Sequence, residues 1–318
     1  MKKALITGIT GFAGSFLAEN LVSTGEYEVS GTYLSDSSVN NVSSISDKVT
    51  LHKVDLQIEE EVNDLISNLK PDFIFHLAAL TSPAESFKNP SEFINNNIDV
   101  EINLLEAVRR ADIKPRILIV SSAETYGAVK SGDLPINENT PMMPVNPYAV
   151  SKLAQDRLGY QYFAAYKIPI VIIRPFNHIG PKQSPDFVVS SFAKKIAEIE
   201  SGKTEPILKV GNLTAKRDFT DVKDMVEAYR LLLEKGEEGE AYNAGSGKST
   251  EIKSILDTLL SFSDKQIAVE VDDSLLRPID VPELVCDNTK IKAATGWEPK
   301  IPLEQTLKEV LDYWRSQG

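Results

Sequence analysis

Short apolar stretches alternate with longer segments in which apolar residues recur every three or four positions. The short stretches end in turn residues or charges and predict six strands, at Lys3–Thr7, Glu28–Thr32, Thr50–Val54, Phe73–Leu77, Arg116–Ser121 and Ile168–Arg174. The longer segments predict helices, at Phe12–Val22, Phe93–Val108 and Pro147–Tyr166. Because continuously apolar strands alternate with helices, we expect an α/β fold with a doubly wound parallel sheet, whose ligands bind at the carboxyl ends of the strands.

This pattern changes after Arg174, where four prolines interrupt the segment up to Pro206 and strands become sparse. The helical pattern of Asp221–Leu233 then predicts a return of the chain to the sheet domain. We therefore expect two domains: a cofactor domain of residues 1–174 and about 219–244, and a smaller α/β substrate domain of residues 175–218 and 245–318.

A glycine-rich turn joins the first predicted strand to the first helix. Gly8, Gly11 and Gly14 have the spacing G-x-x-G-x-x-G. Glycine allows a tight turn and a close approach of the backbone to a pyrophosphate, and the following helix N-terminus supplies N–H donors. The alternative is a strand–helix turn without a ligand. The place of the glycine turn, after the first strand of a predicted parallel sheet, favours a Rossmann-type dinucleotide site.

Residues at later strand ends extend this predicted cofactor site. A carboxylate and a backbone amide after the third strand suit an adenine, and small residues after the fourth leave room for a ribose. The residues expected at the cofactor are Gly8, Thr10, Gly11, Phe12, Ala13, Gly14, Thr32, Asp55, Leu56, Leu77, Ala78, Ala79, Asn97, Tyr148 and Lys152. Both NADP and NAD stay open, because neither an arginine nor an acid follows the second strand directly.

Tyr148 and Lys152 are four residues apart, which places both side chains on one face of a helix. An ammonium group near a phenol lowers the phenol pKa from about 10 toward neutrality. The tyrosine then exchanges a proton with an alcohol or ketone oxygen as hydride moves. A surface pair is the alternative for this spacing alone. Ser122, at the end of the fifth strand, adds a hydroxyl for the same oxygen and favours a hydride-transfer site.

With these motifs, the chain resembles the extended short-chain dehydrogenase/reductase family over essentially its whole length. The matching stretches are LITGITGFAGSFLAENL, FHLAAL, NNNIDVEINLLEAV, IVSSAETYG, NPYAVSKL and RPFNHIGP. The segments KVGNLTAKRDFTDVKD, EAYNAGSGKST, LLRPIDVPEL and GWEPKIPLEQTL look most like the GDP-4-keto-6-deoxy-mannose reductases, which are related to the GDP-mannose 4,6-dehydratases.

The resemblance implies Ser122, Tyr148 and Lys152 as the catalytic set. It also implies Asn177 and Arg217 as substrate contacts, with Arg277 near the diphosphate or the nucleotide. Lys209 is a further candidate substrate residue, expected to reach the nucleotide. Arginine suits a diphosphate because its planar guanidinium donates two parallel hydrogen bonds. The alternatives are a surface ion pair of Arg217 with Asp218 or Asp221, and a loop cap at Asn177.

The loop after Ser122 bears on the reaction. In the related dehydratases it carries Thr, then Asp or Ser, then Glu, and the acidic group helps to remove water across C5 and C6. Here Ala123 lacks the middle polar group, whereas Glu124 remains as a candidate catalytic carboxylate. We expect an NAD(P)H-dependent reductase of a GDP-4-keto-6-deoxy-sugar; a 4,6-dehydratase and a 4-epimerase stay as alternatives. A sensor on the same fold predicts a degraded catalytic set, and all three residues are present.

The composition of the chain argues against several classes of binding partner. A formal net charge of −12 argues against binding to nucleic acid or anionic membranes. The single Cys286 allows no intramolecular disulfide, and no signal segment follows the N-terminus, so we expect a cytoplasmic enzyme. The three histidines have no metal-ligand spacing, and no metal is expected. Residues 98–108 and 153–166 are expected to form a homodimer interface. Ser249 or Thr250 is expected to cap a helix.

Overall fold

The computed structural model describes residues 1–276 and 278–318, and its main layer is a parallel sheet of seven strands. The strand order is β10-β6-β5-β4-β1-β2-β3, and every pairing along it is parallel. The strands are β1 (Lys2–Thr7), β2 (Tyr27–Tyr33), β3 (Val49–Lys53), β4 (Phe73–His76), β5 (Arg116–Val120), β6 (Ile170–Pro175) and β10 (Ala241–Ala244). This order confirms the doubly wound α/β fold, and each of the six predicted strands begins and ends within two residues of its predicted bounds.

Helices cover both faces of this sheet. They are α1 (Phe12–Thr24), α2 (Glu59–Leu69), α3 (Pro83–Lys88), α4 (Pro90–Arg110), α5 (Pro147–Tyr166) and α7 (Val222–Lys235), with the 3₁₀ segments η1 (Asp36–Ile45), η2 (Ala123–Tyr126) and η3 (Ser131–Asp133). Ala4 and Ile6 of β1 point to a core with α1 and α7, while Leu5 points to the opposite core with α2, α4 and α5. The alternation along one buried strand thus serves two apolar layers.

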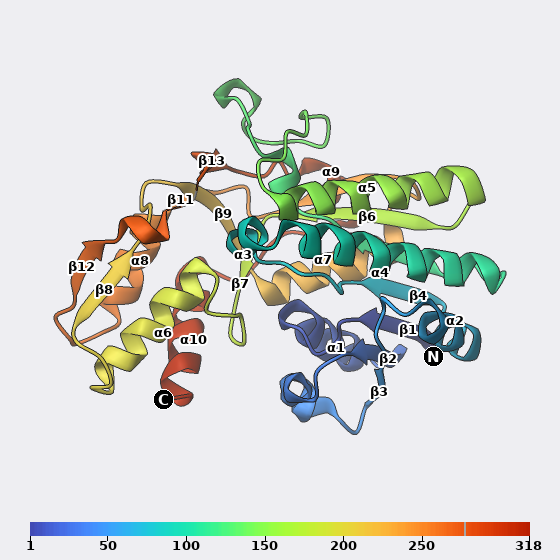
Figure 1. The fold of residues 1–318 in the computed structure, drawn as a ribbon, viewed down its shortest axis with the longest axis horizontal. Coiled ribbons are helices and arrows are strands. Elements are labelled where there is room, and N and C mark those ends of the chain that lie inside the picture. The colour runs from blue at the N-terminus through green and yellow to red at the C-terminus, as the bar shows by residue number, and fades with distance from the viewer. Residues whose placement is uncertain (277) are drawn as a thin grey trace.

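The smaller layer, at the left of Figure 1, has its own core between helices and short strands. Its elements are β7 (Asn177–Ile179), α6 (Val188–Glu200), β8 (Ile207–Val210), β9 (Lys216–Asp221), β11 (Ser249–Glu251), α8 (Ile252–Ser261), β12 (Ala268–Val271), η4 (Asp273–Leu275), β13 (Glu283–Leu284) and α10 (Leu303–Ser316). One further helix, α9 (Thr289–Thr295), lies elsewhere: Ile291 and the nearby Trp297 pack into the core shared by α1 and α7. The stretch after residue 245 therefore contributes to both layers.

The structure corrects one local expectation. Ser249 and Thr250 do not cap a helix, because they lie in β11 and pair with Asp218 and Arg217 of β9. Helix α8 begins after Glu251, whose side chain makes no capping hydrogen bond. The ladder with β9 holds this segment extended until the helix starts.

The outer side of α5 carries exposed aromatic side chains. Tyr160 and Tyr166 are both exposed, on the helix expected to pair with a second copy. The homodimer remains a prediction. None of the helices described above combines the length and the apolar composition needed to cross a bilayer.

Candidate active site at the strand ends

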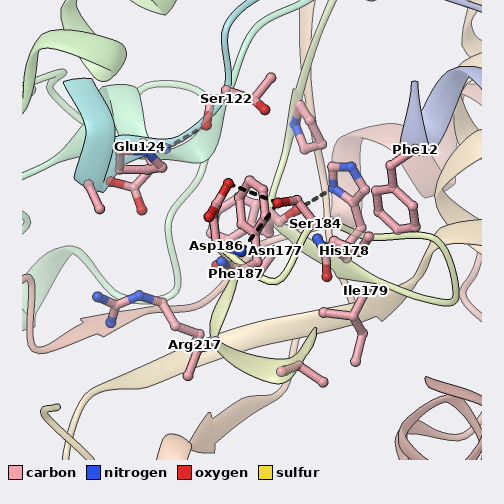
Figure 2. Close-up of a pocket in the computed structure, with 18 of the residues that line it drawn as sticks. Phe12, Ser122, Glu124, Asn177, His178, Ile179, Ser184, Asp186, Phe187 and Arg217 are labelled. Carbon is pink, nitrogen blue, oxygen red and sulfur yellow. Dashed lines mark hydrogen bonds between the residues drawn. The ribbon is translucent and has the colours of Figure 1, made fainter. Parts of the chain in front are cut away.

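A cavity of about 750 Å³ opens between the carboxyl ends of the main strands and the smaller layer. The glycine turn, the ends of β4, β5 and β6, and residues of β7, β8 and β9 line it. Figure 2 shows Ser122 and Glu124 on one side and Phe12 with His178 on the other. The volume lies within the range of small-molecule sites. This is the edge of the sheet at which the sequence predicts a ligand.

The glycine turn has the geometry that a diphosphate requires. Gly8 has a φ of +71°, and its N–H donates to the Thr32 hydroxyl at 3.1 Å. A Cβ at Gly14 would lie 2.2 Å from the Gly8 carbonyl oxygen, so only glycine fits there. No side chain caps the N-terminus of α1. The N–H groups of the first helical turn therefore suit an anionic ligand, and cofactor binding at this turn stays a prediction.

The predicted cofactor residues divide into two groups. Those that line the cavity are Gly8, Gly11, Phe12, Ala13, Gly14, Leu77, Ala78, Ala79, Tyr148 and Lys152. Those that do not line it are Thr10, Thr32, Asp55, Leu56 and Asn97. Direct cofactor contact by the second group stays a prediction.

Two residues of the second group make hydrogen bonds that support segments after the strands. Asn97 is fully buried, bonds the backbone of Leu80 through both side-chain atoms, and donates to the Ser151 hydroxyl at 2.9 Å. Asp55 accepts from the Gln57 N–H at 2.9 Å and so stabilises its own turn. Both contacts are local supports for the loops at the strand ends.

Tyr148 stands at the start of α5 because Asn146 and Pro147 begin the helix there. The Asn146 side chain accepts from the Ala149 N–H, and Pro147 occupies the first turn. Burial raises the pKa of Tyr148 to about 12, a hydrogen bond with Ser122 lowers it, and the Glu124 carboxylate raises it. The phenol is therefore neutral at ordinary pH and lies beside the Ser122 hydroxyl.

Lys152 lies on the same helix as Tyr148. Its Nζ donates to the Gln155 side-chain oxygen at 2.7 Å. Burial lowers the pKa of Lys152 to about 8, while Glu101 and Asp156 raise it. Burial thus keeps the phenol pKa above its ordinary value, and the lowered pKa expected from the sequence is not found. The catalytic role of Lys152 stays a prediction.

The loop after β5 brings one carboxylate to the cavity. Ser122 caps η2 by accepting from the Glu124 N–H at 3.2 Å, and the Glu124 carboxylate accepts from Asn146 at 3.1 Å. Ala123 is buried and has no polar side-chain atom. The loop thus presents a hydroxyl and one carboxylate, both visible in Figure 2.

The candidate substrate residues Asn177, Lys209 and Arg217 all line the cavity. Arg217 is buried, pairs with Asp280 at 2.8 Å and donates to the Val281 carbonyl at 2.7 Å. The alternative pairing with Asp218 or Asp221 is therefore wrong, since Asp280 is its partner. Arg277 lies outside the described residues.

Asp218 and Asp221, the ion-pair partners that the sequence offers for Arg217, make hydrogen bonds elsewhere. Asp218 accepts from Ser246, Gly247 and Cys286 N–H groups, and Asp221 caps α7 and accepts from the Thr306 hydroxyl. Both are buried in structural hydrogen bonds. The Arg217 guanidinium, paired with Asp280 instead, lies at the cavity wall.

The segment between β7 and α6 contributes cavity residues that the sequence did not single out. Ser184 donates to Asp186 at 2.8 Å, and both line the cavity with Phe187. In β7, just before this segment, His178 stacks on Phe12, with the ring centroids 5.9 Å apart and the planes 6° from parallel. Figure 2 shows this segment reaching into the middle of the site. The prolines of this segment predict a loop, but nothing in the sequence predicts that the loop enters the cavity.

The chain is similar to known nucleotide-sugar enzymes. The model of the family described as GDP-mannose 4,6 dehydratase matches residues 5–310. The GDP-6-deoxy-D-mannose reductase of Pseudomonas aeruginosa is 35% identical over 266 residues, covering 84% of this chain and 87% of that protein. The GDP-mannose 4,6-dehydratase of Yersinia enterocolitica is 30% identical, covering 98% of this chain and 93% of that one. The solved structure of RMD from P. aeruginosa complexed with NADPH has a TM-score of 0.86 at 31% identity and covers 100% of both chains.

Proposed function

Because the chain belongs to the GDP-mannose 4,6-dehydratase family, we propose that it is an NAD(P)-dependent nucleotide-sugar oxidoreductase that reduces the C4 ketone of GDP-4-dehydro-6-deoxy-D-mannose. The product is a GDP-6-deoxyhexose. Hydride delivery to one face of the ketone gives GDP-D-rhamnose, and delivery to the other gives the talose epimer. The similarity to a reductase and to a dehydratase supports the class, and the cavity residues support the choice of reaction.

The observation that carries the proposal is the set of groups at the end of β5, where Tyr148 and Ser122 line the cavity and Ala123 offers no polar side chain. Reduction of a ketone needs a proton donor at the developing alkoxide, whereas a dehydratase or epimerase begins by removing a proton from an alcohol. A pKa of about 12 keeps the Tyr148 proton in place at neutral pH. Tyr148 can therefore serve as the proton donor that a reductase needs.

The loop after Ser122 supports the same choice. Loss of water across C5 and C6 requires a base for the C5 proton and an acid for the leaving hydroxyl. Glu124 is the one ionisable side chain among residues 122–124, since Ala123 has no proton to give. A reductase needs neither group, and this loop is sufficient for it.

In this mechanism the cofactor, when bound, supplies the hydride. The glycine turn would hold its diphosphate through backbone N–H groups and the α1 dipole. Arg217 and Asn177 hold the diphosphate of the sugar nucleotide in the cavity. Ser122 donates a hydrogen bond to the C4 oxygen, and Tyr148 transfers its phenolic proton to the same oxygen. Lys152, which lines the same cavity, contributes a positive charge there.

Cofactor consumption tests the proposal. The protein is incubated with GDP-4-dehydro-6-deoxy-D-mannose and, separately, with GDP-mannose, each with NADPH and with NADH. We expect stoichiometric loss of the 340 nm absorbance of the reduced cofactor with the ketosugar alone. Conversion of GDP-mannose into its 4-keto-6-deoxy derivative without net cofactor loss would instead identify a dehydratase. Interconversion at C4 without net consumption would identify an epimerase.

Glu124→Gln separates the two main reactions. For a reductase, the change removes no group that transfers a proton, so we expect the reduction rate to stay within about tenfold of wild type. A dehydratase that used this carboxylate as its base would lose about 10²–10⁴-fold. Initial rates with the ketosugar measure the effect on reduction, and initial rates with GDP-mannose measure the effect on dehydration. Asp133→Asn, an exposed acid in η3, is the matched control for loss of one negative charge.

A further inference from the structure

The segment of residues 180–187, between β7 and α6, packs against helices of the main sheet. Just before it, His178 stacks on Phe12 of α1, and Figure 2 shows the two rings side by side. A Cβ at Gly180 would lie 2.6 Å from a methyl carbon of Val222, so the backbone lies directly against the start of α7. The segment therefore begins in contact with α1 and α7, which share one core of the main sheet.

Lys182 joins this segment to two further positions around the main sheet. Its Nζ donates to the Glu19 carboxylate of α1 at 3.1 Å and to the Asn41 carbonyl of η1 at 2.9 Å. The ammonium group also lies 5.0 Å from the centroid of the Phe16 ring, within the range of a cation–π contact. The lysine and the glutamate are both half-buried. One side chain thus connects the segment with both α1 and η1.

The 3₁₀ segment η1 is in turn bonded to the glycine turn. The Asn41 side chain donates to the Thr10 carbonyl at 2.9 Å, and the Ser38 hydroxyl lies 2.7 Å from the Thr10 hydroxyl. Thr10 belongs to the glycine turn itself. Asn41 therefore bonds the turn through its side chain and Lys182 through its carbonyl oxygen. A ligand that fixes the turn also fixes an acceptor of the lysine.

The other end of the segment is held by the smaller layer. Gln183 donates to the His178 carbonyl at 3.0 Å, and its own carbonyl accepts from the Ser190 hydroxyl of α6 at 2.6 Å. The Ser190 oxygen accepts from the indole N–H of Trp314 in α10 at 2.9 Å. Next to these anchors the cavity is lined by Ser184, Asp186 and Phe187. The segment thus connects the two layers and contributes to the wall between them.

Lys182 differs from other cations that the smaller layer brings to the cavity. Among the residues that the structure describes, Lys209 and Arg217 form ion pairs with acids of the smaller layer itself. Lys182 instead pairs with Glu19, on a helix of the main sheet. Its backbone has a φ of +70°, which is uncommon for a residue other than glycine and persists only where the surrounding structure holds it. The contacts with α1 and η1 supply that hold.

We propose that Lys182 is a positioning residue that couples the cofactor site to the substrate cavity. When a cofactor occupies the glycine turn, Thr10 and Asn41 are held in place, and the Lys182 ammonium group carries this restraint to residues 183–187. Hydride transfer requires two ligands to be aligned across the two layers, and a misplacement of about 1 Å costs about 10²-fold in rate. This role rests on the proposed function only in taking the glycine turn as the cofactor site.

Hydrogen–deuterium exchange of the backbone tests the coupling. A peptide that covers residues 183–191 is followed with and without saturating NADPH in wild type, Lys182→Met and Lys182→Arg. We expect NADPH to slow exchange of this peptide in wild type by about fivefold or more, the lower end of the usual coupling between two sites. Methionine meets the same positive φ with a side chain of similar length but donates no hydrogen bond, so this protection should be lost. Arginine should restore part of it.

A change on the other side of the ion pair provides a second variant. Glu19→Ala is expected to lose part of the protection, because the Asn41 carbonyl still accepts from Lys182. The double variant should lose no more than Lys182→Met alone, since both changes break the same contact. Lys253→Met is the matched control: Lys253 pairs with Asp257 within α8, both are exposed, and the protection should remain. Protection of the glycine-turn peptide reports NADPH binding by each protein.

Two results overturn the proposal. One is a Lys182→Met protein in which NADPH protects residues 183–191 as it does in wild type, and the other is a wild-type protein in which NADPH leaves this peptide unchanged. If Lys182→Met does not fold, undiminished protection in Glu19→Ala overturns it instead. None of these measurements needs a sugar nucleotide. A protein that fails to reduce the ketosugar would therefore reject the proposed reaction, while the exchange rates still decide the role of Lys182.

Discussion

Replacing Tyr148 with phenylalanine is expected to lower the rate of ketosugar reduction by about 10²–10⁴-fold, the usual contribution of a positioned proton donor. The phenyl ring keeps the volume and burial of the side chain and removes only the hydroxyl that faces Ser122. Cofactor affinity should change little. Initial rates and titration of bound NADPH by fluorescence measure the two quantities separately.

Tyr160→Phe provides the control for this change. Tyr160 lies on the same helix α5, but its side chain is exposed and does not line the cavity. Its loss of a hydroxyl should leave the rate unchanged. A Tyr148→Phe enzyme that retained more than a tenth of the wild-type rate would remove Tyr148 from the proton-transfer step.

The second large effect is expected for Gly14→Ala. The added Cβ would meet the Gly8 carbonyl oxygen at 2.2 Å and the Ile9 Cα at 3.0 Å, both of which are backbone atoms that cannot turn aside. The glycine turn must open, and the N–H groups at the start of α1 move away from the diphosphate position. We expect cofactor affinity to fall by about 100-fold or more. A misplacement of about 1 Å at a preorganised site causes a loss of about this size.

Calorimetric titration with NADPH measures this loss, and thermal unfolding reports whether the domain still folds. Gly132→Ala is the matched control, because a Cβ there meets no atom within 4 Å and the residue does not need a positive φ. Unchanged affinity in a folded Gly14→Ala protein would mean that the cofactor diphosphate binds elsewhere.

The strands and the catalytic motif could be predicted because their signals are local. Buried parallel strands are short apolar runs whatever packs on them, and the glycine turn requires its residues for backbone reasons. The spacing of Tyr148 and Lys152 follows from helix geometry alone. These features depend on few distant contacts, and they appear in the structure where the sequence indicates.

The direction of the Lys152 side chain could not be predicted, because it depends on how α4 packs against α5. Glu101 reads in the sequence as an ordinary polar residue of an amphipathic helix, and only the tertiary structure buries it. The Asp280 partner of Arg217 lies 63 residues further along the chain. Charge pairs of this kind are set by the fold and leave no spacing to detect.

The central claim is that hydride from the cofactor reaches C4 of the sugar while Tyr148 protonates the oxygen on that carbon. The most direct test uses NADPH deuterated at the transferable C4 position, with GDP-4-dehydro-6-deoxy-D-mannose in ordinary water and analysis of the product by NMR. We predict one deuterium at sugar C4 and none at C5 or C6. A product without deuterium, or with the label at C6, would contradict the account.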